Sequence, residues 1–231
     1  MSFIPVITID GPSGSGKGTL CRLLAKRLGW HILDSGAIYR LLSLAAQKHQ
    51  IAATNVDKLV QLAAELNIDF RADNKKNESH VFLDNEDVSL DLRTETCGKF
   101  ASQISALPAV RHALLQKQRD FQVAPGLVCD GRDMGTVVFP AADLKIFLIA
   151  SAEERAKRRY KQLKNKGLCV TLRAILEDMV ARDERDSNRN AAPLKPAADS
   201  VQLDSSRLTV NAVLKQVLAL AKERGLLQNI P

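Results

Sequence analysis

A string near the start of the chain, Asp10-Gly11-Pro12-Ser13-Gly14-Ser15-Gly16-Lys17-Gly18-Thr19, constrains the fold more than any other feature. It follows a β-branched run from Ile4 to Ile9 and precedes a leucine-rich stretch with helical spacing. This order predicts a strand, a loop and a helix. Glycines let successive backbone N–H groups curl around an anion, and the following helix adds the positive end of its dipole. The string therefore predicts a phosphate-binding loop and the binding of a nucleoside triphosphate.

The residues at the end of the loop refine this prediction. Lys17 supplies a point charge for the β- and γ-phosphates of the nucleotide, and we expect it to face solvent. Gly18 stands where the usual loop has Ser or Thr, and Thr19 follows, so Mg²⁺ binding through water is favoured over a direct hydroxyl ligand. The alternative interpretation is a flexible Gly/Ser turn before a helix. The match of both spacing and flanks disfavours it.

Composition places the chain among single-domain α/β proteins. With 231 residues, 45% of them hydrophobic, it is long enough for one sizeable domain with insertions. No run approaches the ~20 apolar residues of a membrane span, and the early first strand leaves no room for a signal peptide. Four scattered cysteines without a C-x-x-C pair are typical of reduced thiols. We therefore expect a cytoplasmic protein.

The net charge of +7 raises the question of nucleic acid. Basic residues gather in Arg155-Ala156-Lys157-Arg158-Arg159-Tyr160-Lys161. However, aromatic residues make up only 4% of the chain, and no run of them interleaves with the basic residues as a stacking platform for single strands requires. A site for two polyanionic nucleotides explains the same excess of cations, so we expect no nucleic-acid partner.

Strand-like and helical segments alternate along much of the chain, which predicts a parallel sheet with ligands at the carboxyl ends of its strands. The further predicted strands are 31–33, 126–129, 145–149 and 201–204. The further predicted helices pass through Tyr39 to Ala46, begin at Pro108, follow a capping box at 151–154, and span 172–183 and 209–224. Residues 50–107 differ, because a helix at 56–66, strands at 68–71 and 80–84 and a polar turn at 73–78 predict an α+β insert.

A second polar motif, Asp130-Gly131-Arg132-Asp133, follows a buried apolar strand directly. This position lies on the edge of the sheet where phosphates are expected. Asp130 is suited to orienting the water ligands of Mg²⁺, and Arg132 to meeting a phosphate. The alternatives are a turn aspartate that caps the next segment and a surface arginine.

A third motif places arginines at positions i, i+3 and i+7 of one predicted helical face, namely Arg182, Arg185 and Arg189. Asp183 and Asp186 interleave with them, and a self-paired, solvated face is the alternative interpretation. The phosphate loop favours a catalytic role, because phosphoryl transfer requires charge neutralisation on three equatorial oxygens and exclusion of water. We expect residues 151–189 to close over the nucleotides.

These motifs, together with Leu33-Asp34-Ser35-Gly36 followed by Tyr39-Arg40 and with Gly131-Arg132-Asp133-Met134-Gly135-Thr136, resemble those of the bacterial cytidylate kinase family. The similarity runs in order over essentially the whole chain. It implies an α/β fold: a parallel-sheet P-loop kinase core with helices on both faces, an inserted α+β monophosphate-binding region and a short helical lid. The core would comprise residues 1–33, 108–150 and 190–231, the monophosphate-binding region 34–107 and the lid region 151–189.

The resemblance implies transfer of a phosphoryl group from ATP, bound as Mg-ATP, to CMP or dCMP. The acceptor phosphate oxygen is already ionised at neutral pH, so no general base is needed. Gly11 to Thr19 would hold the donor phosphates, and Lys17, Arg132 and Arg189 would be catalytic. The residues implied in acceptor binding are Ser35, Arg40, Ser102, Arg111, Arg132, Asp133, Arg182, Asp186 and Arg189.

Base choice has a physical logic within this resemblance. The Asp133 carboxylate can accept a hydrogen bond from the cytosine amine while Arg111 donates to the ring acceptors, and Ser102 helps more weakly. Uracil would place its O4 against the carboxylate, which disfavours UMP. Arg182 and Asp186 resemble residues that hold the ribose.

Two alternatives remain open on the residues alone. One is a P-loop kinase for another small acceptor, and the other is an ATPase stimulated by nucleic acid. A GTPase is disfavoured because the chain has no Asn/Thr-Lys-x-Asp motif to read guanine. We expect ATP and CMP or dCMP as the ligands, no membrane attachment, and a monomer.

Overall fold

The computed structural model describes residues 3–73, 78–165 and 167–227. The chain forms two compact units, one of residues 1–34 and 118–231 and the other of residues 35–117. The second unit thus includes residues 108–117, which the sequence analysis assigned to the core. The finer division into core, monophosphate-binding region and lid stays a prediction.

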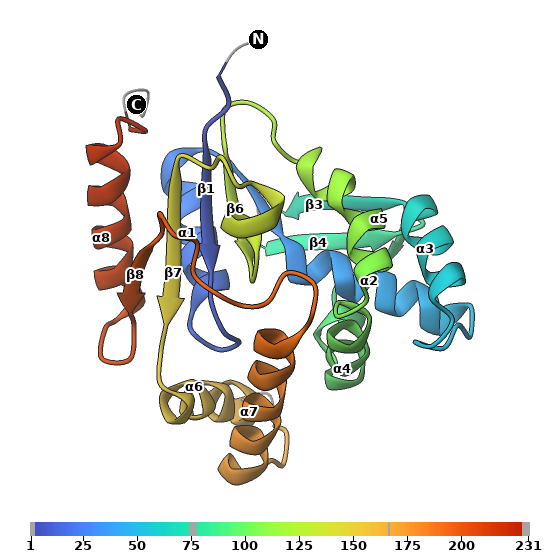
Figure 1. Cartoon of the computed structure of the whole chain (residues 1–231). Helices are drawn as coiled ribbons and strands as arrows, with labels where there is room; N and C mark the ends of the chain where they lie inside the picture. Colours follow the sequence, from blue (N-terminus) through green and yellow to red (C-terminus); the bar gives the residue numbers. More distant parts are fainter. Residues whose placement is uncertain (1–2, 74–77, 166, 228–231) are drawn as a thin grey trace. The chain divides into compact units, whose positions relative to one another are not determined.

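The first unit is built on the predicted parallel sheet, which is confirmed. In the described part of the chain it has five strands, in the order β2-β6-β1-β7-β8, and every neighbouring pair is parallel. Figure 1 shows β6, β1, β7 and β8 side by side. The strands are β1 (Val6–Asp10), β2 (His31–Asp34), β6 (Leu127–Gly131), β7 (Leu144–Ile149) and β8 (Val201–Asp204).

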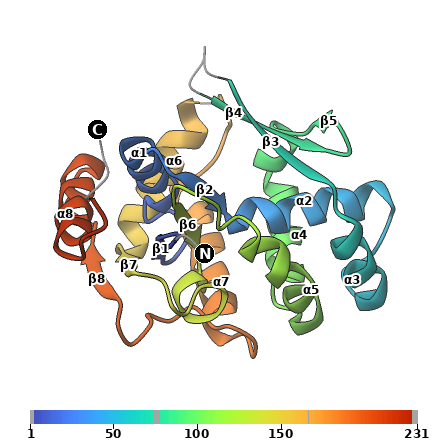
Figure 2. The same ribbon diagram turned by 90° about the horizontal axis from the view of Figure 1, so that it is seen from above.

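Two helices, α1 (Lys17–Leu28) and α8 (Val210–Glu223), pack together against this sheet (Figure 2). Their leucines and valines share one core with the alternate residues of β1 and β7, such as Ile7, Ile9 and Ile146. Gly29 ends α1 in a left-handed conformation with φ of 67°, as its place after the last leucine predicts. The first helix therefore leads from the carboxyl edge of the sheet back along one face.

A pair of helices, α6 (Ala152–Asn165) and α7 (Leu172–Asn188), carries the predicted basic and arginine-rich segments. Ser151 caps α6 as predicted, because the Glu154 N–H donates to Ser151 Oγ at 3.3 Å, but the reciprocal bond of a capping box is not formed, since the Ser151 N–H donates to Ser206 Oγ at 3.0 Å. Ala156, Leu163, Ile175 and Met179 form a small core between the two helices. Helix α7 continues five residues beyond the predicted end at 183.

The second unit confirms the α+β character of the insert. Its elements are α2 (Ser35–Lys48), α3 (Val56–Glu65), β3 (Ile68–Asp73), β4 (Glu78–Leu83), β5 (Glu86–Asp87), η1 (Asp91–Arg93), α4 (Glu95–Ile104) and α5 (Pro108–Arg119), whose last two residues belong to the first unit. Strands β3, β4 and β5 form an antiparallel sheet. Residues 74–77 of the predicted turn lie outside the described residues.

Sequence patterns did not predict β5, η1 or α4. Helix α4 buries mostly small side chains, Cys97, Gly98, Ala101 and Ser102, with Ile104 as its one buried large hydrophobic residue. Thr94 caps it by accepting a hydrogen bond from the Cys97 N–H at 3.3 Å. A helix that packs closely through small residues lacks the leucine periodicity on which the sequence analysis depended.

Two further findings bear on the sequence expectations. Among the described helices, none is long and apolar enough to cross a membrane. All four cysteines are free thiols: Cys21, Cys97 and Cys129 are buried and Cys169 is exposed.

Candidate active site

The phosphate loop joins β1 to α1 and requires glycine at two positions for steric reasons. Gly11 has φ of 146°, and a Cβ there would lie 2.1 Å from the Leu148 carbonyl oxygen. Gly14 has φ of 76°, and a Cβ there would lie 2.7 Å from Cε of Met179. At Gly11 the backbone of β7 leaves no space for a side chain, whereas at Gly14 the Met179 side chain can move and the positive φ is what favours glycine.

Lys17, at the start of α1, is buried rather than solvent-facing. Its exposed fraction is 5%, and its ammonium group donates to the Pro12 carbonyl oxygen at 2.7 Å and to Ser15 Oγ at 3.4 Å. Burial, reinforced by the positive charge of Arg132, lowers the pKa of Lys17. The prediction of a solvent-facing lysine is wrong, because the loop folds around the ammonium group.

Two carboxylates lie at the carboxyl ends of neighbouring strands, and the charge of one of them, Asp130, acts on Lys17. Asp34 of β2 pairs in register with Asp130 of β6, and Asp130 Oδ2 lies 3.2 Å from where a Cβ of Gly18 would be. Burial raises the pKa of Asp130 against the opposing effect of Lys17. Within the described residues no group of three or more His, Cys, Asp or Glu side chains could hold a metal ion. One or two carboxylates beside a phosphate loop nevertheless fit Mg²⁺, which keeps several waters and takes phosphate ligands.

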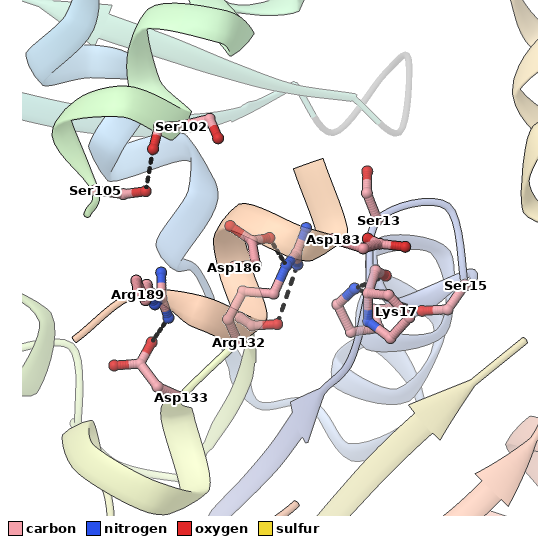
Figure 3. A network of polar contacts seen from close by, with 12 residues as sticks. Ser13, Ser15, Lys17, Ser102, Ser105, Arg132, Asp133, Asp183, Asp186 and Arg189 are labelled. Carbon is pink, nitrogen blue, oxygen red and sulfur yellow. Dashed lines mark hydrogen bonds and ion pairs between the residues drawn. The ribbon is translucent and has the colours of Figure 1, made fainter. Parts of the chain in front are cut away.

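Arg132 and Asp186 form a buried ion pair between the loop after β6 and helix α7 (Figure 3). Arg132 Nε lies 3.0 Å from Asp186 Oδ2, and the side chains are 18% and 7% exposed. Burial acts to raise the pKa of Asp186, but the charges of Arg132 and Arg182 outweigh it and hold that pKa below its usual value. Two of the predicted acceptor-binding groups therefore meet each other in the first unit.

Arg189 and Asp133 form a second buried pair, labelled in Figure 3. Arg189 Nη2 lies 3.7 Å from Asp133 Oδ1, and the side chains are 4% and 3% exposed. The predicted helical face from Arg182 to Arg189 is wrong, because α7 ends at Asn188 and Arg189 has extended backbone angles, while Arg185 is exposed. The chain turns at Arg189, which directs this guanidinium toward the loop after β6.

Asp10, to which the sequence analysis gave no role, anchors the loop after β6. Its two carboxylate oxygens accept hydrogen bonds from the Met134 and Gly135 N–H groups, both at 2.8 Å. Burial raises the pKa of Asp10 to about 6 although these bonds oppose it. A π-helical turn, η2 (Met134–Val138), begins at the same residues. Asp10 thus fixes the backbone next to Arg132 and Asp133. The position of Asp10 at the carboxyl end of a predicted buried strand is the sequence feature that could have indicated this role.

The predicted residues of the second unit have ordered surroundings of their own. Arg40 of α2 donates to the Leu92 carbonyl oxygen at 2.7 Å and to that of Thr94 at 3.2 Å. A Cβ at Gly98 would lie 2.8 Å from the Arg40 guanidinium, so glycine leaves the space that Arg40 needs.

Three further predicted residues of this unit are buried. Arg111 is 9% exposed, donates to the Ser105 carbonyl oxygen at 3.0 Å and lies 5.6 Å from the centre of the Tyr39 ring. Ser102 is 6% exposed, and its hydroxyl has no hydrogen-bond partner among the described residues. Ser35 is the buried first residue of α2. A buried arginine and a buried hydroxyl available for a ligand both favour a binding role over the surface alternative.

The basic cluster of α6 contains two contacts that the sequence analysis missed. Arg155 donates to the Ser13 carbonyl oxygen and Arg158 to that of Ser15. These two arginines of the basic cluster are therefore directed at the phosphate loop. Helical spacing i, i+3 was the signal that they share a face.

Comparison with known proteins gives a consistent result. The family model described as cytidylate kinase matches residues 7–223. A cytidylate kinase of Pseudomonas fluorescens (strain Pf0-1) is 60% identical over 218 residues, covering 94% of this chain and 95% of the relative. One of Pseudomonas entomophila is 58% identical over 216 residues, with 94% and 95% covered. One of Pseudomonas putida (strain KT2440) is 55% identical over 226 residues, with 98% and 99% covered.

Proposed function

The chain belongs to the cytidylate kinase family, and from this premise we propose that it transfers a phosphoryl group from ATP to CMP or dCMP, giving ADP and CDP or dCDP. The observation that carries the proposal is the pair of cations at the phosphate loop. Lys17 is buried within the loop, and Arg132 is close enough for its charge to lower the pKa of that lysine. Two cations at the end of the phosphate loop suit a polyanionic ligand, and a transferring phosphoryl group is such an anion.

The loop and Lys17 bind the donor. Residues 11–19 hold the β- and γ-phosphates through their backbone N–H groups, which all of them except Pro12 have, and the ammonium of Lys17 neutralises the phosphate charge. Binding of the polyphosphate opposes the effect of burial, so Lys17 is charged in the complex. The resident lysine therefore acts as a fixed electrostatic stabiliser and does not exchange protons during transfer.

Arginines carry the transfer step itself. The acceptor phosphate oxygen is ionised, so the protein needs no general base and contributes position and charge. Arg132 and Arg189 stabilise the negative charge that spreads over the equatorial oxygens, and Arg40 holds the acceptor phosphate. Their ion pairs with Asp186 and Asp133 keep the first two guanidinium groups ordered before substrate arrives.

The acceptor nucleoside is recognised by hydrogen bonding. Asp133 accepts from the cytosine amine, and Arg111 and the Ser102 hydroxyl donate to the ring acceptors. Asp186 and Arg182 hold the ribose, and Ser35 also binds the monophosphate. The buried state of Asp133, 2% exposed, supports this role because desolvated carboxylates discriminate strongly between donors and acceptors.

Magnesium enters with ATP. Asp130, which pairs in register with Asp34, is suited to orienting the water ligands of the ion. When bound, the ion neutralises charge on the β- and γ-phosphates.

The wider expectations stand as proposals. We propose a monomer that acts in the cytoplasm without a nucleic-acid partner, and a lid formed by residues 151–189. The four free thiols support the location, and the inward direction of Arg155 and Arg158 supports the absence of a nucleic-acid role for the basic cluster.

A coupled assay of ADP release tests the proposal. The purified protein is given Mg-ATP with CMP, dCMP, UMP, AMP or GMP in turn, and with DNA or RNA in place of a monophosphate. We expect ADP formation that depends on CMP or dCMP and is weaker with the other monophosphates. Preference for another acceptor, or ADP release that depends on DNA or RNA without CMP, would contradict it.

A further inference from the structure

Arg155 of α6 has a buried guanidinium group that the proposed function leaves without a role. Its side chain is 6% exposed, and all three nitrogens have partners. Nε donates to the Ala150 carbonyl oxygen at 3.0 Å, Nη1 donates to that of Ser13 at 3.0 Å, and Nη2 lies 2.6 Å from Asp183 Oδ2. One planar side chain thus joins the end of β7, the phosphate loop and α7. Lysine, with a single nitrogen, cannot make three such contacts in this geometry.

The contact with Ser13 fixes the direction of a backbone donor. The Ser13–Gly14 peptide is trans, since Ala124–Pro125 is the cis bond found among the described residues. In a trans peptide the carbonyl oxygen and the following N–H point in opposite directions. With the Ser13 oxygen held toward Arg155, the Gly14 N–H is directed away from α6.

The carbonyl group of Ser15, two residues after Ser13, is held in the same way. The Ser15 carbonyl oxygen accepts from Arg158 Nη1 at 3.2 Å and from Ser205 Oγ at 2.9 Å. Gly14 and Gly16 both have positive φ, 76° and 100°. This left-handed geometry helps successive N–H groups to form an anion-binding concavity. Donors outside the loop therefore hold the carbonyl groups of Ser13 and Ser15. The N–H groups of Gly14 and Gly16 point away from these donors.

The two carbonyls differ in how many donors hold them. Ser15 has an arginine and a serine, whereas within the described residues Arg155 is the one side-chain donor found on the Ser13 carbonyl. Loss of Arg155 would leave this peptide free to rotate, because Gly14 has no side chain to restrict it.

We propose that Arg155 is a positioning residue for the donor: by holding the Ser13 carbonyl it aims the Gly14 N–H at the phosphates of ATP. Through Asp183 it also ties the loop to α7, the helix that carries Arg182 and Asp186. The inference rests on the proposed function only in taking ATP as the ligand of the loop.

Steady-state kinetics of Arg155→Met and Arg155→Lys separate positioning from general support of the fold. We expect kcat/KM for ATP to fall about 10- to 100-fold in Arg155→Met, the size expected for a misaligned reacting group. The dissociation constant of CMP alone should stay within about twofold of the wild-type value, because the contacts of Arg155 are to Ala150, Ser13 and Asp183, none of them proposed to bind the acceptor. Lys157→Met is the matched control, since Lys157 lies on the same helix with an exposed side chain paired to Glu154.

Amide NMR gives a readout that does not depend on turnover. In the wild-type protein, titration with ADP should shift the Gly14 N–H proton downfield as it bonds a phosphate, and in Arg155→Met this shift should be lost while that of Gly16 persists. If Arg155→Met does not fold, Arg155→Lys carries the same test, with a smaller loss in kcat/KM for ATP.

The failure of this inference is distinct from that of the proposed function. A wild-type protein that forms no ADP with CMP contradicts the proposed function, and the ADP titration still tests Arg155. An active wild-type protein whose Arg155 variants keep kcat/KM for ATP within about threefold and show the normal Gly14 shift overturns the inference alone.

Discussion

Two ion pairs of the molecule differ in how far their charged side chains are exposed to solvent. Arg132 and Asp186 of the first unit are 18% and 7% exposed, whereas Lys48 and Glu86 of the second unit are 45% and 65% exposed. An exposed pair contributes little to stability. A buried pair loses so much hydration energy that apolar residues of similar volume are often as stabilising or more so. The comparison teaches that the buried charges of the first unit need a reason other than stability, and phosphoryl transfer supplies one.

The largest expected effect comes from a buried lysine at the loop. Lys17→Met should lower kcat/KM by on the order of 10³-fold, because it removes a preorganised charge from the transferring phosphates. Circular dichroism and thermal unfolding should show a folded protein.

Lys145→Met is the matched control for this variant. Lys145 is also buried and donates to the Pro140 carbonyl oxygen at 2.6 Å and to Asp199 at 2.9 Å, but it has no assigned role. The Lys145→Met variant should lower the melting temperature and leave kcat/KM within a few-fold of wild type. Equal losses of activity in the two variants would show that buried lysines matter here only for the fold.

The second effect is a pH dependence of opposite sign in the two units. The folded-state pKa of Asp10, about 6, lies above its ordinary value of 3.8, so the folded chain holds more protons between these pH values. Stability must then fall as pH rises through this interval, by up to about 3 kcal/mol. The test compares the unfolding free energies of wild type and Asp10→Asn at each pH. We expect the difference, wild type minus variant, to decline by up to about 3 kcal/mol between pH 4 and pH 7. A difference that stays constant would contradict the burial of a raised-pKa carboxyl.

Asp87 of the second unit provides the contrast. Hydrogen bonds from the Ser89 hydroxyl and backbone N–H, with a contribution from His80, lower the pKa of Asp87 to about 2. The stability it contributes is present above pH 3.8 and is lost as pH falls through 2. The unfolding free energy of wild type minus that of Asp87→Asn should therefore rise as the pH increases from about 2 to about 4 in denaturant titrations.

The third effect concerns the reading of the base by Asp133. Asp133→Asn replaces an acceptor with a group that can also donate to O4 of uracil. The ratio of kcat/KM for CMP to that for UMP should move toward UMP by roughly 10- to 100-fold, since a mismatched polar partner in a closed site costs about 1–3 kcal/mol. If Asp133 only orients Arg189, its buried partner at 3.7 Å, both efficiencies will fall together and the ratio will not change.

The smallest effect belongs to the exposed pair. Lys48→Met should change the unfolding free energy by less than about 1 kcal/mol and leave kcat/KM unchanged, because solvent screens both partners. Urea titration and the coupled assay at low and high salt measure this. A large loss at low salt would remove the distinction between the two ion pairs.

The parallel sheet and the phosphate loop could be predicted from the sequence because both depend on local patterns. Local sequence alone identifies the apolar runs at 126–129 and 145–149 and the glycines of residues 11–16. Helix α4 was missed because it packs through small residues rather than through a leucine stripe.

The residues of the candidate site could be proposed from their type and motif, whereas their surroundings could not be predicted. Arg132, Asp133 and Asp186 are buried and paired in the structure, but their partners could not be read from spacing. The contacts of Asp10, Arg155 and Arg158 depend on how the phosphate loop lies against η2 and α6. Such contacts between segments more than a hundred residues apart leave no periodic signal in the sequence.

The central claim is that the buried charges of the first unit serve transfer rather than stability. The most direct test is the double variant Arg132→Met with Asp186→Leu, which replaces the buried pair by apolar side chains. We predict a melting temperature equal to or above that of wild type, with kcat/KM for CMP lowered by on the order of 10²-fold or more. Retained activity, or a loss of activity fully explained by unfolding of the variant, would contradict the claim.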